Sequence, residues 1–259
     1  MSEGQQWDAE RYELDGRFVS ELGNEILEWL CARQGEHILD LGCGDGALTE
    51  KILDAGAIVT GIDPSADMVE AARRRGLYIK QMDALNLEEN GVYDAVFSNA
   101  VLHWIEDWEA LFLVVKRSLK EGGRFVVECG GHGNIAAIRT AIVAAADHFN
   151  VETKAGAETY LTPQDASDLL LDAGFKVERI ELVGRRTELK TGMERWLRLF
   201  RCQFFNQFDD DAQKRQVMQH LLKWLAPQLR ISRRDEQTGL DLDGQWVADY
   251  VRLRFIART

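Results

Sequence analysis

The sequence has few prolines and cysteines, 3 and 4 among 259 residues. It contains no apolar run of the roughly 20 residues that span a bilayer. The N-terminal segment lacks the basic and apolar parts of a secretory signal peptide, so we expect a cytoplasmic protein with no membrane partner. No two cysteines form a C-x-x-C pair, which argues for reduced thiols and against a metal site.

An excess of positive charge is also missing, because the formal net charge is −12. Nucleic acids are polyanions that bind basic surfaces, so we expect no nucleic-acid partner. The basic run Arg73–Arg75 stands at the end of an expected helix, where cations are favoured by the helix dipole. We therefore interpret this run as a solvated helix end.

Short β-branched segments alternate with helical patterns through the first half of the chain. This alternation is typical of an α/β fold with a doubly wound, mostly parallel sheet. The expected strands are residues 37–41, 58–62, 77–81, 95–98 and 124–128, and the expected helices are residues 47–54, 66–75 and 108–119. Two late strands are expected at residues 175–189 and 245–257.

We expect a single domain over residues 1–259. Residues 1–35 supply an N-terminal helix and lid, with an amphipathic helix over 12–33, and residues 36–130 form a cofactor-binding core. Residues 131–160 and 191–240 are expected to be insertions on the substrate side; the second is helical and rich in aromatic residues.

The segment from Asp40 to Gly46 reads D-L-G-C-G-D-G and joins an apolar strand to a helical pattern. Glycines lack a Cβ atom, so such a loop turns tightly and lets a ligand approach the backbone. The N–H groups at the start of the following helix add hydrogen-bond donors. The loop therefore indicates a nucleotide-like cofactor, but it also satisfies the G-x-G-x-x-[GA] pattern of dinucleotide-binding proteins.

Acidic residues follow the second and third strands. Asp63 stands where a carboxylate accepts hydrogen bonds from ribose hydroxyls, and Asp83 stands where one accepts from an adenine amino group. Asp40 precedes the glycine loop, where it anchors the backbone or a cationic ligand group. Repeated acids suit a cofactor with ammonium and sulfonium charges better than an anionic pyrophosphate. An NAD-dependent oxidoreductase and a non-catalytic cofactor-binding protein remain the alternatives from other classes.

Taken together, D-x-G-x-G-x-G at 40–46, the acids at 63 and 83, and Y-D-A-V-F-S-N at 93–99 resemble the class I S-adenosylmethionine-dependent methyltransferases. The resemblance implies a Rossmann-like, seven-stranded sheet whose last strand is antiparallel, and S-adenosyl-L-methionine as cofactor. The cofactor-binding residues it suggests are Asp40, Gly42, Cys43, Gly44, Asp63, Pro64, Met68, Asp83, Ala84 and Asn99. Trp7 and Tyr12 precede the first expected helix, where we expect them to form a lid over the cofactor, with simple packing as the alternative.

The stretch N-A-V-L-H-W at 99–104, the loop E-C-G-G-H-G-N at 128–134 and the ending W-V-A-D-Y-V-R at 246–252 resemble the small-molecule branch near trans-aconitate methyltransferases. Malonyl-acyl-carrier-protein O-methyltransferases share the Asn-to-Trp spacing. Both methylate carboxylates, so the resemblance implies a small carboxylate substrate methylated by in-line displacement. The alternative is N-, O- or C-methylation of a natural-product scaffold with His103 or Glu128 as base.

Methyl transfer mainly requires that nucleophile, methyl group and sulfur be held in line, so orienting groups matter more than a catalytic dyad. The catalytic candidates follow expected strands and are His103, Glu128 and His132; the substrate-binding candidates are Trp104, Asn134, Arg195 and Trp196. Each has a structural alternative: packing for the histidines and tryptophans, backbone hydrogen bonding for Glu128 and a solvated helix face for Arg195. We expect a monomer or homodimer with a small-molecule substrate.

Overall fold

The computed structural model describes residues 15–153, 159–234 and 241–259. The chain divides into two compact units. Unit 1 comprises Met1–His132, Thr159–Val183 and Arg252–Thr259, and unit 2 comprises Gly133–Glu158 and Gly184–Val251. The two segments expected to be insertions, residues 131–160 and 191–240, contribute most of unit 2.

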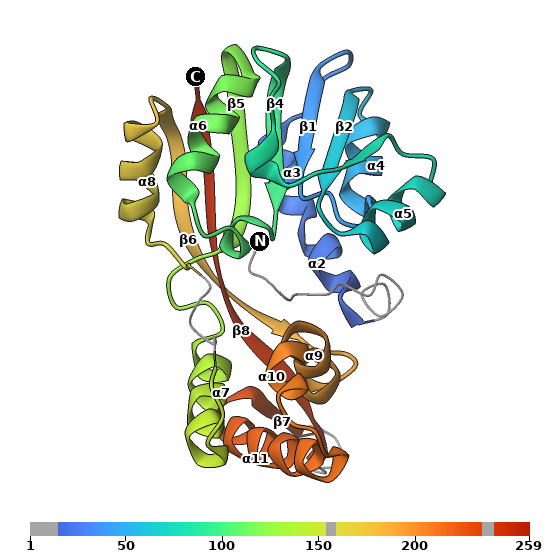
Figure 1. The fold of residues 1–259 in the computed structure, drawn as a ribbon, viewed down its shortest axis with the longest axis vertical. Coiled ribbons are helices and arrows are strands. Elements are labelled where there is room, and N and C mark those ends of the chain that lie inside the picture. The colour runs from blue at the N-terminus through green and yellow to red at the C-terminus, as the bar shows by residue number, and fades with distance from the viewer. Residues whose placement is uncertain (1–14, 154–158, 235–240) are drawn as a thin grey trace. The chain divides into compact units, whose positions relative to one another are not determined.

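The sheet that begins in unit 1 has the strand order β3-β2-β1-β4-β5-β8-β6 (Figure 1). The strand bounds are β1 His37–Leu41, β2 Ile58–Asp63, β3 Ile79–Gln81, β4 Tyr93–Asn99, β5 Leu119–Gly130, β6 Lys176–Glu188 and β8 Asp241–Arg258. Strands β1 to β5 pair in parallel, whereas β8 pairs antiparallel with β5. The α/β, mostly parallel sheet is confirmed, and eight strands rather than seven are present among the described residues, because β7 also pairs with β8.

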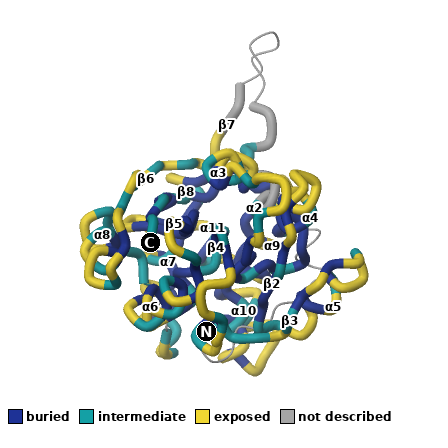
Figure 2. The backbone as a smooth tube through the Cα atoms, turned by 90° about the horizontal axis from the view of Figure 1, so that it is seen from above, coloured by how far each residue is buried: buried dark blue, intermediate teal, exposed yellow. Residues whose placement is uncertain are grey.

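Successive residues of the central strands contribute to separate hydrophobic clusters. Ile38 of β1 packs with the cluster that includes helices α3 (Asn24–Leu30) and α4 (Ala47–Asp54). Its neighbour Leu39 packs with the cluster that includes helices α6 (Trp108–Ser118) and α8 (Pro163–Asp172). In β4, Phe97 likewise belongs to the cluster with α3 and α4, and its neighbour Val96 belongs to the cluster with α6 and α8. Because side chains alternate between the two faces of a strand, both faces of this sheet are buried, as in doubly wound folds. Figure 2 shows the buried residues in dark blue and the exposed outer residues of α5, α6 and α8 in yellow.

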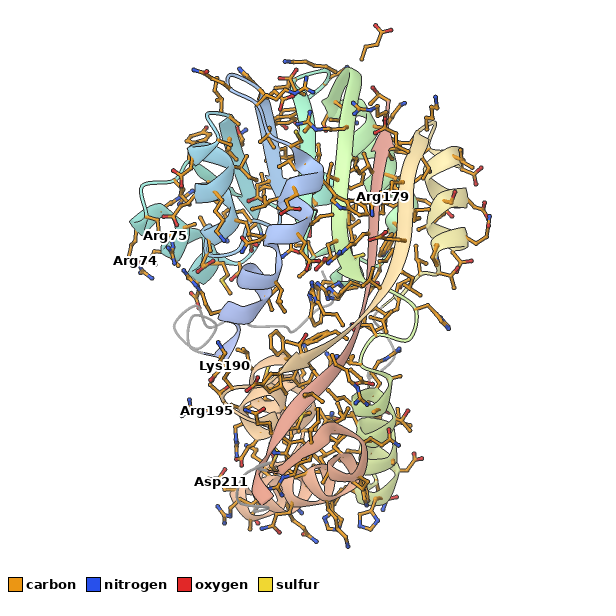
Figure 3. All side chains as sticks on the ribbon, turned by 180° about the vertical axis from the view of Figure 1, so that it is seen from behind. Arg74, Arg75, Arg179, Lys190, Arg195 and Asp211 are labelled. Carbon is orange, nitrogen blue, oxygen red and sulfur yellow. The ribbon has the colours of Figure 1, made fainter. Side chains whose placement is uncertain are left out.

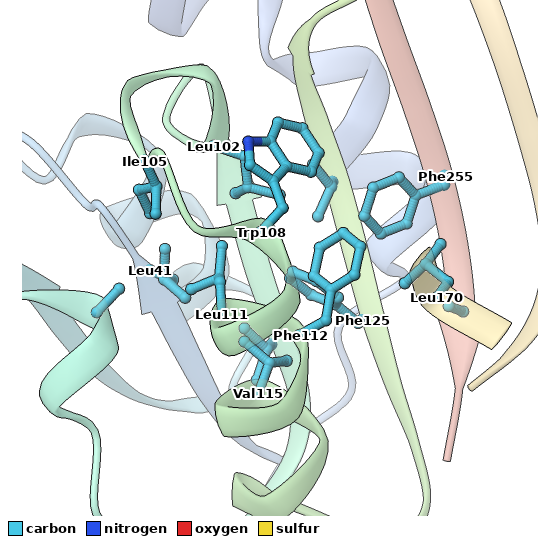
Figure 4. Packing of buried hydrophobic residues seen from close by; sticks show 14 of the residues in the cluster. Leu41, Leu102, Ile105, Trp108, Leu111, Phe112, Val115, Phe125, Leu170 and Phe255 are labelled. Atoms are coloured by element: carbon cyan, nitrogen blue, oxygen red, sulfur yellow. The ribbon is translucent and has the colours of Figure 1, made fainter. Parts of the chain in front are cut away.

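The largest cluster of unit 1 is centred on aromatic rings (Figure 4). Phe112 of α6, Phe125 of β5 and Phe255 of β8 meet edge to face, with ring centroids 5.3–6.0 Å apart. Such edge-to-face pairs stabilise a core beyond the area that they bury. The contact joins the antiparallel strand β8 to the parallel part of the sheet.

The helices begin and end close to the residues expected from the sequence. Ser65 caps α5, and Thr162 forms a capping box with Asp165 at the start of α8. The expected helix over 12–33 begins outside the described residues and is divided at Gly23 into two short helices. The helices of unit 1 are α2 Arg17–Leu22, α3 Asn24–Leu30, α4 Ala47–Asp54, α5 Ala66–Arg74, α6 Trp108–Ser118 and α8 Pro163–Asp172, with short 3-10 helices η1 Ala84–Asn86 and η2 Leu102–Trp104.

Unit 2 is mainly helical, and β6 and β8 continue into it from unit 1. Its further elements are α7 Ala136–Phe149, α9 Met193–Phe200, α10 Cys202–Asn206, α11 Asp211–Leu229 and β7 Arg230–Arg234. The indole Nε1 of Trp196 donates a hydrogen bond to the Tyr250 hydroxyl at 2.7 Å, and its ring packs against Phe200. No helix in the described part of the chain has the length and hydropathy to cross a membrane.

Candidate functional site

A pocket in unit 1 lies where β1, β2 and β4 reach their carboxyl ends. It has about 690 Å³ of space that protein atoms do not fill, open solvent included. Its lining residues are Leu41, Gly42, Gly44, Ile62, Asp63, Pro64, Met68, Met82, Asp83, Ala84, Asn99, Ala100, Val101, Trp104 and Ile105. The structure thus brings together most of the residues predicted to bind the cofactor.

The glycine loop forms one wall of this pocket. A Cβ atom at Gly42 would lie 2.3 Å from Cγ2 of Val101, so only glycine permits this approach of the two loops. Gly44 has φ +56°, and a Cβ atom placed there would meet no described protein atom within 4 Å. The missing side chain at Gly44 therefore leaves open space beside the backbone, as the sequence pattern predicts for a ligand cradle.

Asp63 ties this loop to the end of β2. Its Oδ2 accepts the Gly44 N–H at 3.0 Å, and its Oδ1 accepts the Ser65 N–H at 2.9 Å. Burial raises the pKa of Asp63, and the two backbone hydrogen bonds partly oppose the shift. Each carboxylate oxygen has two acceptor positions, so Asp63 retains capacity for ligand hydroxyls.

Two residues predicted to bind the cofactor do not line the pocket. Asp40 is fully buried, accepts the Thr49 hydroxyl at 2.6 Å, and has its pKa raised to about 7 chiefly by burial. It therefore supports the loop from behind. Cys43 packs with Val69 and Leu77, and burial raises the pKa of its thiol, so it serves as a small core residue.

Asn99 and Asp83 stand at two other strand ends on this pocket. Asn99 Oδ1 is buried and has no hydrogen-bond partner among the residues that the structure describes. Buried acceptors are normally paired, so this atom fits a donor group of a bound ligand. Asp83 Oδ1 accepts the Leu85 N–H at 3.0 Å at the start of η1, which fixes its carboxylate at the pocket edge.

The residues after β4 form a turn that supports the other side of the pocket. Ala100 has φ +62°, a left-handed conformation that costs a residue with a Cβ atom about 1–2 kcal/mol. His103 is buried, and its Nδ1 accepts the Gly130 N–H at 3.1 Å. Its ring lies beside Trp104, which lines the pocket, and Tyr160. A neutral imidazole that accepts at Nδ1 carries its proton on Nε2. The catalytic role predicted for His103 stays a prediction.

Glu128, predicted as a candidate general base, has structural partners in the core, and its catalytic role stays a prediction. Its side chain is 1% exposed and is held by Arg252 at 3.3 Å and Arg254 at 2.6 Å. Arg254 also contacts Glu25 of α3 at 2.6 Å. Glu128 therefore acts as the centre of a buried ion-pair network.

The other predicted residues lie elsewhere. His132 is exposed in unit 1, and Asn134 is buried in unit 2, where its Oδ1 accepts the Val251 N–H. Arg195 is exposed on α9 of unit 2 (Figure 3), whereas Trp196 belongs to the interior of that unit. Trp7 and Tyr12 lie outside the described residues. The catalytic role of His132, the lid role of Trp7 and Tyr12, and the substrate roles of the other residues stay predictions.

The basic run at the end of α5, of which Figure 3 labels Arg74 and Arg75, makes contacts within the chain. Arg73 donates to the Ile79 carbonyl, and Arg74 pairs with Glu70. Arg75 pairs with Asp45 of the glycine loop and with Glu50 of α4, both at 3.2 Å. The run thus braces the helix end and the loop.

Sequence reasoning missed several lining residues. Met82 precedes the predicted Asp83, and Ala100, Val101 and Ile105 surround the predicted Trp104. Their apolar side chains carry no chemical signature, and only their position just after a strand end could have suggested them.

Comparisons with known proteins agree with this geometry. Residues 39–127 match the family model described as a methyltransferase domain. An uncharacterized methyltransferase of Schizosaccharomyces pombe is 33% identical over 97% of this chain and 97% of its own. The chain belongs to the class I S-adenosylmethionine-dependent methyltransferases.

More distant methyltransferases resemble parts of the chain or its fold. A trans-aconitate 2-methyltransferase of Rhodococcus jostii is 31% identical over 49% of this chain and 50% of its own. The solved structure of a proposed methyltransferase from Bacillus halodurans shares the fold, with a TM-score of 0.60 and 14% identity over 91% of this chain and 97% of that chain. Because the chain belongs to the methyltransferases, the alternative of an NAD-dependent oxidoreductase is rejected.

We expect the Gly44→Val substitution to lower the affinity for S-adenosylhomocysteine at least about tenfold, because the added side chain would occupy the open space beside the loop. Gly91→Val is the matched control, since Gly91 has a similar φ of +64°, equally open surroundings and no place in the pocket. Calorimetric titration of both variants measures the effect. Equal affinities would contradict the placement of the ligand at Gly44.

We expect Asp40 to make stability depend on pH. Its pKa in the folded protein, about 7, is above the unfolded value, so the folded state holds the extra proton between about pH 4 and 7. The free energy of unfolding should therefore fall by roughly 2 kcal/mol between pH 5 and 7 relative to Asp40→Asn. Denaturant unfolding at both pH values measures this, with Asp54→Asn, an exposed change on α4, as control. A wild-type profile parallel to that of Asp40→Asn would contradict the prediction.

Proposed function

We propose that this enzyme transfers a methyl group from S-adenosylmethionine to a carboxylate of a small organic acid and so forms a methyl ester. The main observation is that the two buried side chains predicted as candidate bases, His103 and Glu128, both have partners within the protein. His103 accepts a backbone N–H, and Glu128 is held by two arginines. An amine or hydroxyl acceptor generally needs a base, whereas a carboxylate is ionised at pH 7 and needs none.

The pocket fits the cofactor on observations of its own. Gly44 leaves space beside the backbone, Asn99 Oδ1 is an unfilled acceptor, and Asp63 offers a buried carboxylate. These residues would hold the methionine end and the ribose, and Asp83 would hold the adenine at the edge formed by η1. The cofactor, when bound, supplies a methyl group activated by the positive charge on sulfur.

The residues of the chain then hold the reacting groups in position and shield them from water. Trp104 and Val101 give the pocket an apolar wall beside the glycine loop, which excludes water from the point of transfer. His103 supports that wall from behind through its contact with the Trp104 ring. Nucleophile and methyl group are thus brought together by orientation rather than by proton transfer. Similarity to a trans-aconitate 2-methyltransferase, which extends along 49% of the chain, supports a carboxylate acceptor.

The acceptor class is tested with a panel of small di- and tricarboxylic acids, each paired with its amide and its alcohol. We expect S-adenosylhomocysteine and an alkali-labile methyl ester only with the acids, as detected by mass spectrometry, because only a carboxylate is a nucleophile without a base. Methylated products from the amides or alcohols alone would contradict the carboxylate proposal, and so would an acid panel without any ester.

The His103→Gln variant tests the absence of a general base. Loss of such a base costs about 10²–10⁴-fold in rate, so we expect kcat/KM to fall less than tenfold. The ratio of variant to wild-type kcat/KM should also be equal at pH 6 and pH 8. His37→Gln, a change at an exposed histidine at the start of β1, is the matched control. A ratio for His103→Gln that falls with rising pH would identify His103 as a base.

A further inference from the structure

Ala100 has an unusual backbone conformation at the pocket. Four non-glycine residues of the described chain have positive φ angles, namely Cys31, Ala100, Ile135 and Asn150. Ala100, at φ +62°, is the member of this group that lines the pocket. Residues with a Cβ atom adopt this conformation when the surrounding structure imposes it, and such positions gather at functional sites.

The end of β5 imposes the conformation through two hydrogen bonds. The Ala100 N–H donates to the Glu128 carbonyl at 2.7 Å, and the Gly130 N–H donates to His103 Nδ1 at 3.1 Å. The β5 end is itself fixed, because Arg252 and Arg254 hold the buried Glu128 carboxylate. The first half of the turn Asn99–Trp104, at Ala100, and its second half, at His103, are therefore each hydrogen-bonded to the fixed end of β5.

This turn joins the two sides of the pocket. Asn99 precedes Ala100 and carries the unfilled acceptor Oδ1. Val101 follows it and packs so closely on the glycine loop that a Cβ atom at Gly42 would be 2.3 Å from Val101 Cγ2. Trp104, on the pocket wall, and His103, beside it, lie further along the same turn. A change in φ at Ala100 would move Asn99 relative to Val101 and Trp104.

We propose that Ala100 is a positioning residue, whose left-handed conformation aligns Asn99 and the glycine loop with the wall formed by Val101 and Trp104. It acts through the direction in which it turns the chain rather than through its methyl group. The proposal rests on the assignment of the pocket to S-adenosylmethionine. It adds a residue that neither the glycine-loop pattern nor the acidic residues identify.

The test compares three substitutions that separate conformation from size. Glycine adopts positive φ freely, asparagine tolerates it, and β-branched valine disfavours it strongly. Asparagine is about as large as valine, so a steric effect in the pocket would affect both variants. The Cys31→Val variant is the control for strain, because Cys31 has φ +48° and lies outside this pocket.

We expect Ala100→Gly and Ala100→Asn to bind S-adenosylhomocysteine within about threefold of the wild type, and Ala100→Val to bind at least about tenfold more weakly in calorimetric titrations. Thermal unfolding is measured in parallel. Cys31→Val should lose stability but retain affinity, which distinguishes positioning from a general loss of structure.

Three results would overturn the proposal. Equal weakening by asparagine and valine would show that size alone matters, and wild-type affinity in Ala100→Val would show that the conformation does not matter. Equal weakening in Cys31→Val would show that strain acts through global stability. Failure of the wild-type protein to bind S-adenosylhomocysteine is a separate result, which would instead contradict the cofactor assignment of the pocket.

Discussion

Parallel strand pairing is the constraint on which this structure depends. Because β1, β2, β3 and β4 run in the same direction and lie side by side, their carboxyl ends meet at one edge of the sheet. Residues that are far apart in sequence, such as Gly44, Asp63, Asp83 and Asn99, therefore line one pocket. Ligands of open α/β sheets bind at such an edge because the loops there diverge and leave space.

A second constraint comes from charges in the interior. Glu128 brings a carboxylate into the core of unit 1, and Arg252 and Arg254 of β8 neutralise it. Removing one partner from a buried pair typically costs about 3–5 kcal/mol, because the remaining charge stays uncompensated. Arg254 extends the network to Glu25 of α3. The same strand end thus joins the last strand, an N-terminal helix and the turn at Ala100.

Local patterns predicted much of the fold. The strand at 37–41 and the helix at 47–54 were expected with the observed bounds, because hydrophobic periodicity and glycine positions determine them locally. The third strand is shorter than predicted, since only Ile79–Gln81 pairs with β2. The expected helix over 12–33 is interrupted at Gly23, where a Cβ atom would lie 2.8 Å from Leu48 Cδ1. That close approach depends on a residue 25 positions away, which no local pattern reveals.

The site residues likewise fall into those that a local sequence pattern reveals and those that it does not. Gly42, Gly44 and Asp63 were found because glycine spacing and acids at strand ends carry chemical information. The partners of Glu128 could not be predicted, because they stand more than 120 residues later in the chain. Ala100 carried no signal at all, because a left-handed alanine has the same letter as a helical one. Sequence patterns therefore identify functional groups better than they identify the partners that restrain them.

The late position of β8 has a consequence for folding during synthesis. This strand lies between β5 and β6 in the sheet but follows every other described element along the chain. Until the ribosome has released it, β5 has an open hydrogen-bonding edge and β6 has no neighbour in the sheet. Glu128 also lacks both arginines, so burying it at that stage is unfavourable. Unit 1 therefore completes its sheet only after β8 has been synthesised, and the β5 edge is exposed to incorrect pairing until then.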